Sequence, residues 1–447
     1  MSSKSSTRTP SSEQTFQNKT SKIRWLALLG TILLVLAGAA LYISRTPGGL
    51  VESKPSETHP ILSNPGPWGE LEYIPIDIEI PDHFLDSIDG TPPTWFFGGY
   101  TKGALANFLK GCGLGREQET ALMNQASWEM NQEGCRIRVE DKLVRSLSPH
   151  SRSAIYNALA RFPENIDQYA PNLYRPERID DRLEKGRLSP ETIRQFKELL
   201  YPAGNMVAFA DSGLILRSMS NQTERLRFMK TVSRRGSFLI KLNVRPDSDV
   251  KALVKYWGGG AHAKDFEPLL ESLTRVSGGC KIDIAHLLPP FARKRIYTFP
   301  HQVDTADQLN QDCHWTSFNF FREIPQDDFS DPEAAIARFE TEYELVGSDT
   351  RNARYGDMLV FQGSSGINVH SAIYIADDMI FTKNGAGKDQ PWIFMKLEDL
   401  RAIYVLPNGS IELSLYRRKA KISYLRSVPE QRSAGIVSSA VSHKRLM

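Results

Sequence analysis

The hydrophobic and polar positions of the C-terminal third predict two helices followed by a small sheet. A mixed run over residues 312–323 predicts a helix, and Asp331-Pro332-Glu333 opens a second helix that reaches Tyr343. Short apolar runs bounded by Gly, Asn and Asp then indicate strands. These runs cover residues 357–361, 368–376, 379–383, 392–395 and 411–418, and a short helix starts at residue 397. Helices followed by a small antiparallel sheet make an α+β layout.

Residues 71–300 show a different pattern, which predicts a mainly helical region with a few strands. Ser148-Pro149 and Ser189-Pro190 each place a capping serine before a proline, which is tolerated at the first helical position. Residues 238–244 alternate as in a strand with one buried face. These patterns define elements but indicate no chemistry for the region.

The longest apolar run lies near the N-terminus and predicts a transmembrane anchor over residues 23–44. The stretch from Trp25 to Ile43 is long enough to cross a bilayer, which needs about 20 residues. Several basic residues precede it and Arg45 alone follows it, so we expect the N-terminus in the cytoplasm and the bulk of the chain outside. Ala37-Gly38-Ala39 leaves cleavage by a signal peptidase as an alternative.

The remaining segments set the expected domain boundaries. Residues 1–22 are polar and predict a disordered cytoplasmic tail, and residues 424–447 predict a disordered C-terminal tail. Residues 45–70 are rich in Pro, Gly, Ser and Thr and predict an extended linker. Two globular parts are then expected, namely the helical region 71–300 and a second domain over 301–423.

Charge and cysteine usage exclude several classes of function. The chain has 447 residues and a net charge of +3, and no basic stripe with interleaved aromatics predicts a nucleic-acid partner. The 4 cysteines show no CxxC spacing, and no helix presents His-x-x-x-His or Glu-x-x-His, so we expect no metal and no cofactor. Cys112 and Cys135 are compatible either with a disulfide in an oxidising compartment or with burial as small apolar side chains.

A cysteine followed by a histidine is the strongest chemical signal. Cys313 stands at the start of the predicted helix 312–323, and His370 lies in the predicted strand 368–376. A thiol reacts as its thiolate, and both a helix N-terminus and a neighbouring imidazolium lower a thiol pKa. The order of these two residues therefore predicts nucleophilic thiol chemistry, whereas burial of both as ordinary core residues is the alternative.

Three segments in this order resemble the NlpC-type cell-wall cysteine peptidases, a family with a compact papain-like fold. They are Asp312-Cys313, then Gly356-Asp357-Met358-Leu359-Val360-Phe361, and then His370-Ser371-Ala372-Ile373-Tyr374-Ile375. Leu415-Tyr416-Arg417-Arg418 is similar to the closing strand of that family. The resemblance covers about a quarter of the chain and implies a papain-like fold for residues 301–423.

The resemblance also implies roles for individual residues. Cys313 would be the nucleophile, with its backbone N–H helping to hold the oxyanion, and His370 would be the general base and acid. The third polar residue of the family falls near Thr382, where the family often has a second histidine. We expect Asn384 to orient the imidazole because its amide oxygen can accept the ring N–H, with Thr382 itself and Asp389 as the alternatives. His314-Trp315 replaces the usual Ser-Gly after the nucleophile.

The function that the resemblance implies is hydrolysis of amide bonds through a thioester, with the peptide stem of peptidoglycan as the substrate. An outward-facing, membrane-tethered enzyme would meet that polymer. Two alternatives remain open. The papain-like part could be an impaired binding or scaffolding module of the cell envelope, or it could be another thiol amidase or acyl transferase.

Overall fold

The computed structural model describes residues 60–85, 94–124, 127–259, 263–300, 311–330, 332–364, 366–408 and 410–419. All of them belong to one compact unit, residues 59–447. The predicted tails, the predicted anchor 23–44 and residues 45–59 of the predicted linker lie outside these ranges. None of the helices in the described ranges is long and apolar enough to cross a bilayer.

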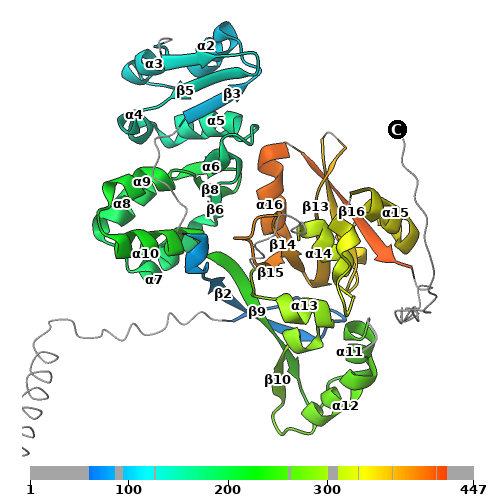
Figure 1. The fold of residues 1–447 in the computed structure, drawn as a ribbon. Helices are drawn as coiled ribbons and strands as arrows, with labels where there is room; N and C mark the ends of the chain where they lie inside the picture. Colours follow the sequence, from blue (N-terminus) through cyan, green and yellow to red (C-terminus); the bar gives the residue numbers. More distant parts are fainter. Residues whose placement is uncertain are drawn as a thin grey trace, which may run out of the picture. The chain divides into compact units, whose positions relative to one another are not determined.

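The C-terminal part is an α+β structure around an antiparallel sheet, as predicted (Figure 1). The sheet is 6-stranded, with the order β11-β16-β12-β13-β14-β15. Its strands are β11 (Tyr343–Gly347), β12 (Met358–Gly363), β13 (Asn368–Ala376), β14 (Met379–Lys383), β15 (Trp392–Lys396) and β16 (Ile411–Arg418). Five of these six strands match the predicted runs to within two residues at each end, because each run carries the apolar residues that a buried strand needs.

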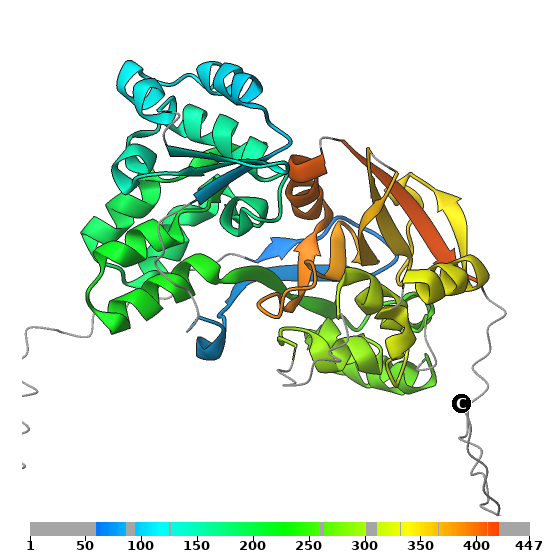
Figure 2. The ribbon, with the colours of Figure 1, turned by 45° about the horizontal axis from the view of Figure 1, so that its top comes forward.

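Helices cover both faces of this sheet. The helices are α14 (Cys313–Asn319), α15 (Pro332–Glu342) and α16 (Leu397–Asn408). One face packs Val360, Ile373 and Phe381 against the core that includes Trp315 of α14. The other face packs Phe361, Ala372 and Ile380 against Leu400 of α16. Figure 2 shows this helix beside the sheet. Successive residues of β12, β13 and β14 therefore alternate between the α14 face and the α16 face.

Helix α14 is shorter than the predicted helix 312–323. Its last residue, Asn319, uses its side-chain amide to donate to the carbonyls of Trp315 (3.0 Å) and Gln326 (3.1 Å). The amide oxygen of Asn319 accepts from the backbone N–H of Gln326 at 2.7 Å. These bonds close a turn just after the helix, and the hydrophobic pattern alone does not reveal them.

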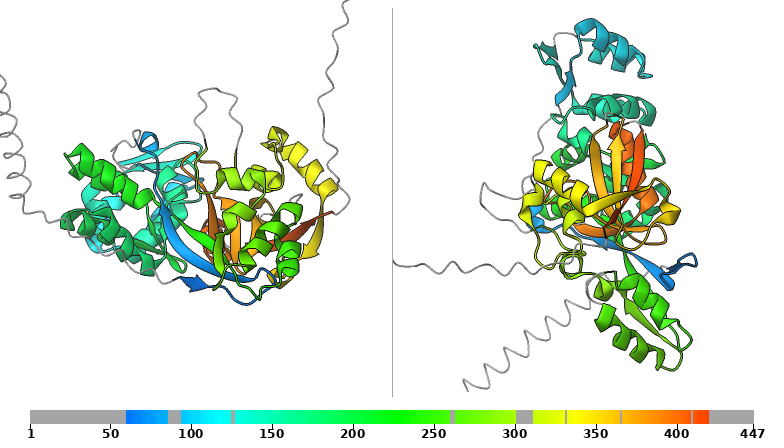
Figure 3. Two further views of the ribbon diagram at one scale, coloured as in Figure 1. Left: turned by 90° about the horizontal axis from the view of Figure 1, so that it is seen from below. Right: turned by 90° about the vertical axis from the view of Figure 1, so that its right-hand side faces the viewer.

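A second antiparallel sheet, β1-β2-β9-β10, shares the core of the α14 face. Its strands are β1 (Ile61–Leu62), β2 (Glu70–Ile78), β9 (Arg235–Val244) and β10 (Cys280–Asp283). The helices α11 (Val250–Trp257) and α12 (Ala263–Thr274) lie side by side near β10, and α13 (Pro290–Arg295) follows (Figure 3). The hydroxyl of Ser237 in β9 bonds both the N–H and the C=O of Phe394 in β15, each at 3.1 Å. The second sheet is thereby fixed to the 6-stranded one.

Residues 80–232 contribute a separate hydrophobic core. Its two 3-stranded sheets have the orders β3-β5-β4 and β6-β8-β7. The strands are β3 (Thr94–Gly98), β4 (Trp128–Met130), β5 (Gly134–Arg138), β6 (Asn172–Tyr174), β7 (Tyr201–Ala203) and β8 (Met206–Phe209). The helices are α2 (Lys102–Lys110), α3 (Arg116–Leu122), α4 (Asp141–Ser146), α5 (Pro149–Leu159), α6 (Ile166–Tyr169), α7 (Ile179–Gly186), α8 (Pro190–Glu198), α9 (Ser212–Ser218) and α10 (Gln222–Ser233). This region also has the short 3-10 helices η1 (Asp82–Phe84) and η3 (Pro176–Arg178), whereas η4 (Ile284–Leu287), η5 (Asp327–Ser330) and η6 (Thr350–Asn352) lie later in the chain.

The two predicted capping serines of this region are confirmed. Ser148 accepts from the N–H of Ser151 at the start of α5, and Ser189 accepts from Thr192 at the start of α8. Cys112 and Cys135 are both free and buried, so they serve as apolar core residues in this structure.

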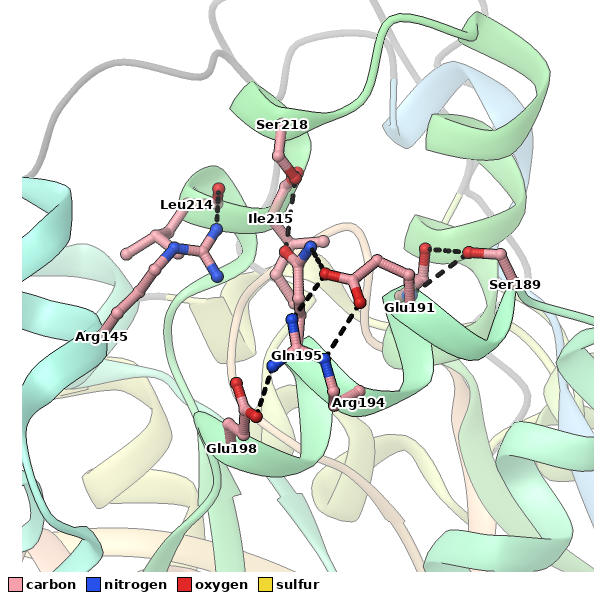
Figure 4. A network of polar contacts seen from close by, with 10 residues as sticks. Arg145, Ser189, Glu191, Arg194, Gln195, Glu198, Leu214, Ile215 and Ser218 are labelled. Atoms are coloured by element: carbon pink, nitrogen blue, oxygen red, sulfur yellow. Dashed lines mark hydrogen bonds and ion pairs between the residues drawn. The ribbon is translucent and has the colours of Figure 1, made fainter.

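The exposed side of α8 carries a network of polar side chains (Figure 4). Arg194 donates to Glu191 and to Glu198, each at 2.6 Å, and Gln195 donates to Glu191 at 2.7 Å. The hydrogen bonds from Arg194 and Gln195 lower the pKa of Glu191 to about 2. Because these groups face solvent, the network contributes little to the stability of the fold.

The hydrophobic cores divide the described chain at a different place from the expected boundary between residues 300 and 301. Residues 71–73 and 240–296 share one core with the helix α14 and the 6-stranded sheet. Phe291 of α13, for example, lies 5.2 Å from Trp315 of α14, measured between ring centroids. A local sequence pattern predicts where a helix or strand lies but not which elements it packs against. Here β2, β9 and α13 pack against the C-terminal sheet and its helix α14.

We therefore expect a fragment of residues 301–423 not to fold by itself. Without β2, β9 and α13, the α14 face of the sheet would expose its apolar side chains to water, at a cost of about 25 cal/mol per Å². Circular dichroism of this fragment should show no cooperative thermal transition. A fragment of residues 59–447 is the matched control and should melt cooperatively, whereas a cooperative melt of the shorter fragment would show that the C-terminal part folds independently.

Candidate functional site

The cysteine of the site is the first residue of α14. The carboxylate of Asp312 caps the helix by accepting from the backbone N–H of Trp315 at 2.9 Å. Cys313 follows it and is 5 % exposed. The cap orders the backbone around the thiol because it satisfies one of the free N–H groups of the first turn.

Tertiary contacts hold α14 in place through Trp315 and Thr316. Trp315 is fully buried and packs on Phe291, and the guanidinium of Arg295 lies 4.1 Å from the Phe291 ring centroid and 5.1 Å from the Trp315 ring centroid. The indole N–H of Trp392 donates to the hydroxyl of Thr316 at 2.9 Å. The tryptophan that departs from the Ser-Gly pattern is thus a core anchor for the helix.

His314 places a second imidazole next to the cysteine. Its ring is hydrogen-bonded to the backbone of Asn368, at the start of β13. Desolvation lowers the pKa of His314 below its usual value, although the charge of Asp312 and the bond to Asn368 act in the opposite direction. This contact joins the first turn of α14 to the first residue of the strand that carries His370.

Neighbouring residues of β13 face opposite sides of the sheet. The hydroxyl of Ser371 donates to the backbone C=O of Cys313 at 3.3 Å and lies 3.0 Å from the hydroxyl of Ser317, so Ser371 lies on the α14 face. His370 lies on the α16 face, where its ring is stacked on Tyr404 with 4.3 Å between centroids. The structure therefore brings Cys313 and His370 to the same end of the sheet. The direct contact with Cys313 is made by Ser371, the residue after His370.

Thr382 of β14 contacts the His370 ring. Its hydroxyl oxygen lies 2.9 Å from Nε2, whereas Nδ1 is buried without a hydrogen-bond partner among the residues that the structure describes. An imidazole that donates its Nε2–H to the threonine oxygen keeps the lone pair of Nδ1 free to accept a proton. In this tautomer Nε2 is hydrogen-bonded to Thr382, and Nδ1 can accept a proton.

Asn384, the residue expected to orient the imidazole, makes no hydrogen bond to the His370 ring among the described residues. Its side-chain nitrogen lies 3.7 Å from the sulfur of Met395, and its amide oxygen is buried without a partner in the described part of the chain. Asp389, the alternative, pairs with Arg235 at 3.2 Å. The reason is that β14 ends at Lys383, so Asn384 already belongs to the following loop and leaves the ring contact to Thr382.

Lys383 is a functional candidate that the sequence did not single out. It is fully buried at the end of β14, and its Nζ donates to the carbonyls of Gly385 (2.8 Å) and Gly387 (2.9 Å). Desolvation lowers the pKa of Lys383 to about 8, and the charges of Asp389, Cys313 and Asp312 act against that shift. A lysine that ends an apolar strand is typical of a surface position, so no sequence signal marked it.

Tyr404 of α16 was also missed. Burial raises the pKa of Tyr404, and the charges of Cys313 and Asp312 raise it further, which places its hydroxyl near the start of α14. Its stacking on His370 covers the imidazole from the α16 side. The sequence pattern of an amphipathic helix does not predict which of its residues will contact a catalytic candidate such as His370.

The Gly356-Asp357 pair that precedes β12 shapes the fold rather than the chemistry. Gly356 has a φ of 87°, and a Cβ at this position would lie 2.1 Å from the ring of Phe321. The carboxylate of Asp357 accepts from Arg417 of β16 at 3.0 and 2.7 Å and from the backbone N–H of Arg354 at 2.8 Å. Asp357 therefore connects the turn before β12 to the last strand of the sheet.

No family model matches the chain, and neither a curated protein nor a solved structure matches it. The site itself is therefore the basis for a functional proposal.

Proposed function

We propose that this chain is a membrane-anchored thiol hydrolase that cleaves amide bonds outside the cytoplasm, with peptidoglycan stem peptides as its substrate. In this proposal the anchor is residues 23–44, and the C-terminal part is a papain-like domain of the NlpC type. Cys313 is the nucleophile, and His370 moves the proton.

The state of the His370 ring carries the proposal. Its Nε2 is held by the hydroxyl of Thr382, and its Nδ1 is buried and has no hydrogen-bond partner among the described residues. A buried polar atom without a partner is costly, and a role in catalysis is one reason why such an atom is retained. Cys313 lies at this end of the sheet, since its backbone carbonyl accepts from the hydroxyl of Ser371, the neighbour of His370 in the chain.

The chemistry that follows is acyl transfer in two steps. The thiolate of Cys313 attacks the amide carbonyl, and the protonated His370 gives its proton to the leaving amine, which leaves a thioester on the enzyme. Water, deprotonated by His370, then hydrolyses the thioester and releases the carboxylic acid and the thiol. Thr382 keeps the ring oriented through both steps.

The test is digestion of purified peptidoglycan by the full-length protein in detergent, followed by mass spectrometry of the released peptides. New carboxyl ends that are absent with Cys313→Ala are expected. Products that carry an added amine instead of a new carboxylate would indicate an acyl transferase. Identical products from the wild type and Cys313→Ala would overturn the hydrolase.

A binding module is the second candidate, and one observation favours it. Cys313 is only 5 % exposed and His370 is fully buried under Tyr404. A substrate carbonyl therefore reaches the thiol only if the residues that cover it move. Retention of full-length Cys313→Ala by insoluble peptidoglycan, without cleavage by the wild type, is the outcome that would support this candidate.

A further inference from the structure

The two faces of the sheet present different side chains to the start of α14. On β14, Phe381 packs toward α14, with its ring 5.5 Å from that of Phe320. Lys383 lies two residues further along the strand and therefore points to the same face, whereas Thr382 points to the α16 face with His370. Lys383 thus shares the α14 face with Ser371, the residue that bonds the carbonyl of Cys313.

The hydrogen bonds of Lys383 suit an amine that exchanges a proton. Its Nζ meets two backbone carbonyls, those of Gly385 and Gly387. A neutral amine has two N–H groups and one lone pair, so these carbonyls use both donors and leave the lone pair. An ammonium has three N–H groups, so its third is left for an anion.

We propose that Lys383 is a second proton-exchanging partner of Cys313. Its neutral amine accepts the thiol proton, so that S–H and NH₂ become a thiolate and an ammonium, and the ammonium then stabilises the thiolate. The inference rests on the proposed function in one respect, because His370 is then left to protonate the leaving amine. Lys383 acts on the nucleophile and sets the state from which the reaction starts.

The other charged and titratable groups around this pair come from four elements. Asp312 and His314 flank Cys313 at the start of α14, and Asp389 lies in the loop after β14. Tyr404 of α16 is close enough to feel the charges of Cys313 and Asp312, and its ring is stacked on that of His370 in β13. Since desolvation brings the pKa of Lys383 to about 8, both of its protonation states are accessible near neutral pH.

A purely structural role for Lys383 predicts something different. The two carbonyl bonds also order the loop over residues 384–391, so loss of the amine would loosen that loop. Such loosening would make Cys313 more accessible, and its alkylation would become faster or stay the same. Loss of the charge partner would make alkylation slower, because less thiolate is present.

The experiment measures the alkylation rate of Cys313 by iodoacetamide in the full-length protein, followed by peptide mass spectrometry from pH 5 to pH 10. At pH 7 we expect Lys383→Met to react at least about tenfold more slowly than the wild type, and its rate should recover at higher pH. Lys388→Met is the matched control, because Lys388 is an exposed lysine of the same loop. It should react at the wild-type rate.

Folding of each variant is checked by its thermal transition. A folded Lys383→Met that is alkylated at the wild-type rate across the pH range would overturn the proposal. If Lys383→Met does not fold, His370→Ala decides, since retained fast alkylation at pH 7 supports Lys383 and its loss refutes it. Alkylation needs no substrate, so a Lys383-dependent rate without peptidoglycan cleavage would refute the proposed substrate and leave the Cys313–Lys383 pair standing.

Discussion

Cys313→Ala is expected to abolish the release of peptides from peptidoglycan, because the covalent route begins at this sulfur. His370→Ala should lower the rate by at least about a thousandfold, since the leaving amine then has no proton donor and the hydrolytic water has no base. The double variant should be no slower than either single variant, because groups that act as a unit are not additive. The measurement is the initial rate of new carboxyl ends by mass spectrometry.

Two further substitutions separate the roles of Thr382 and Asn384. Thr382→Val keeps the shape of the side chain but removes the hydroxyl that lies 2.9 Å from Nε2 of His370, so it should slow the reaction by about tenfold or more. Asn384→Ala removes an amide that does not hydrogen-bond the ring, so it serves as the matched control with a smaller effect on the maximal rate. The reverse order of these effects would restore Asn384 as the orienting residue.

Gly356→Ala is expected to destabilise the fold strongly while it leaves the side chains of the candidate site unchanged. The φ of 87° is strained for any residue with a Cβ, and the added methyl would lie 2.1 Å from the ring of Phe321. Backbone strain of about 1–3 kcal/mol and overpacking of about 1–3 kcal/mol together predict a loss of about 2–6 kcal/mol. Urea unfolding followed by tryptophan fluorescence measures the change.

Gly366→Ala isolates the contribution of the backbone. Gly366 has a φ of 80°, but a Cβ at this position would meet nothing within 4 Å. Only the backbone strain, about 1 kcal/mol, is then lost. Equal losses for Gly356→Ala and Gly366→Ala would show that Phe321 moves aside without cost, and that the close approach of its ring does not explain the glycine.

The C-terminal strands and the capped helix starts were predictable because their signals are local. A strand such as β13 needs only a run of apolar residues, and a helix such as α5 needs only a serine that bonds its own first turn. The same holds for Gly356-Asp357 as a turn before a strand. Cys313 and His370 could be named as candidates for the same reason, since residue type and order suffice to suggest thiol chemistry.

The sequence by itself therefore determined the α+β class, the C-terminal strands and the pair of residues whose chemistry is worth testing. Only the tertiary structure decided that β2, β9 and α13 complete the core around α14, since hydrophobic contact between distant segments leaves no periodic signal in either segment. It also decided that Thr382 rather than Asn384 holds the imidazole, because the end of β14 falls between them. The burial of Lys383 on the α14 face of the sheet depends both on the direction of β14 and on the position of α14, and no local sequence pattern encodes either.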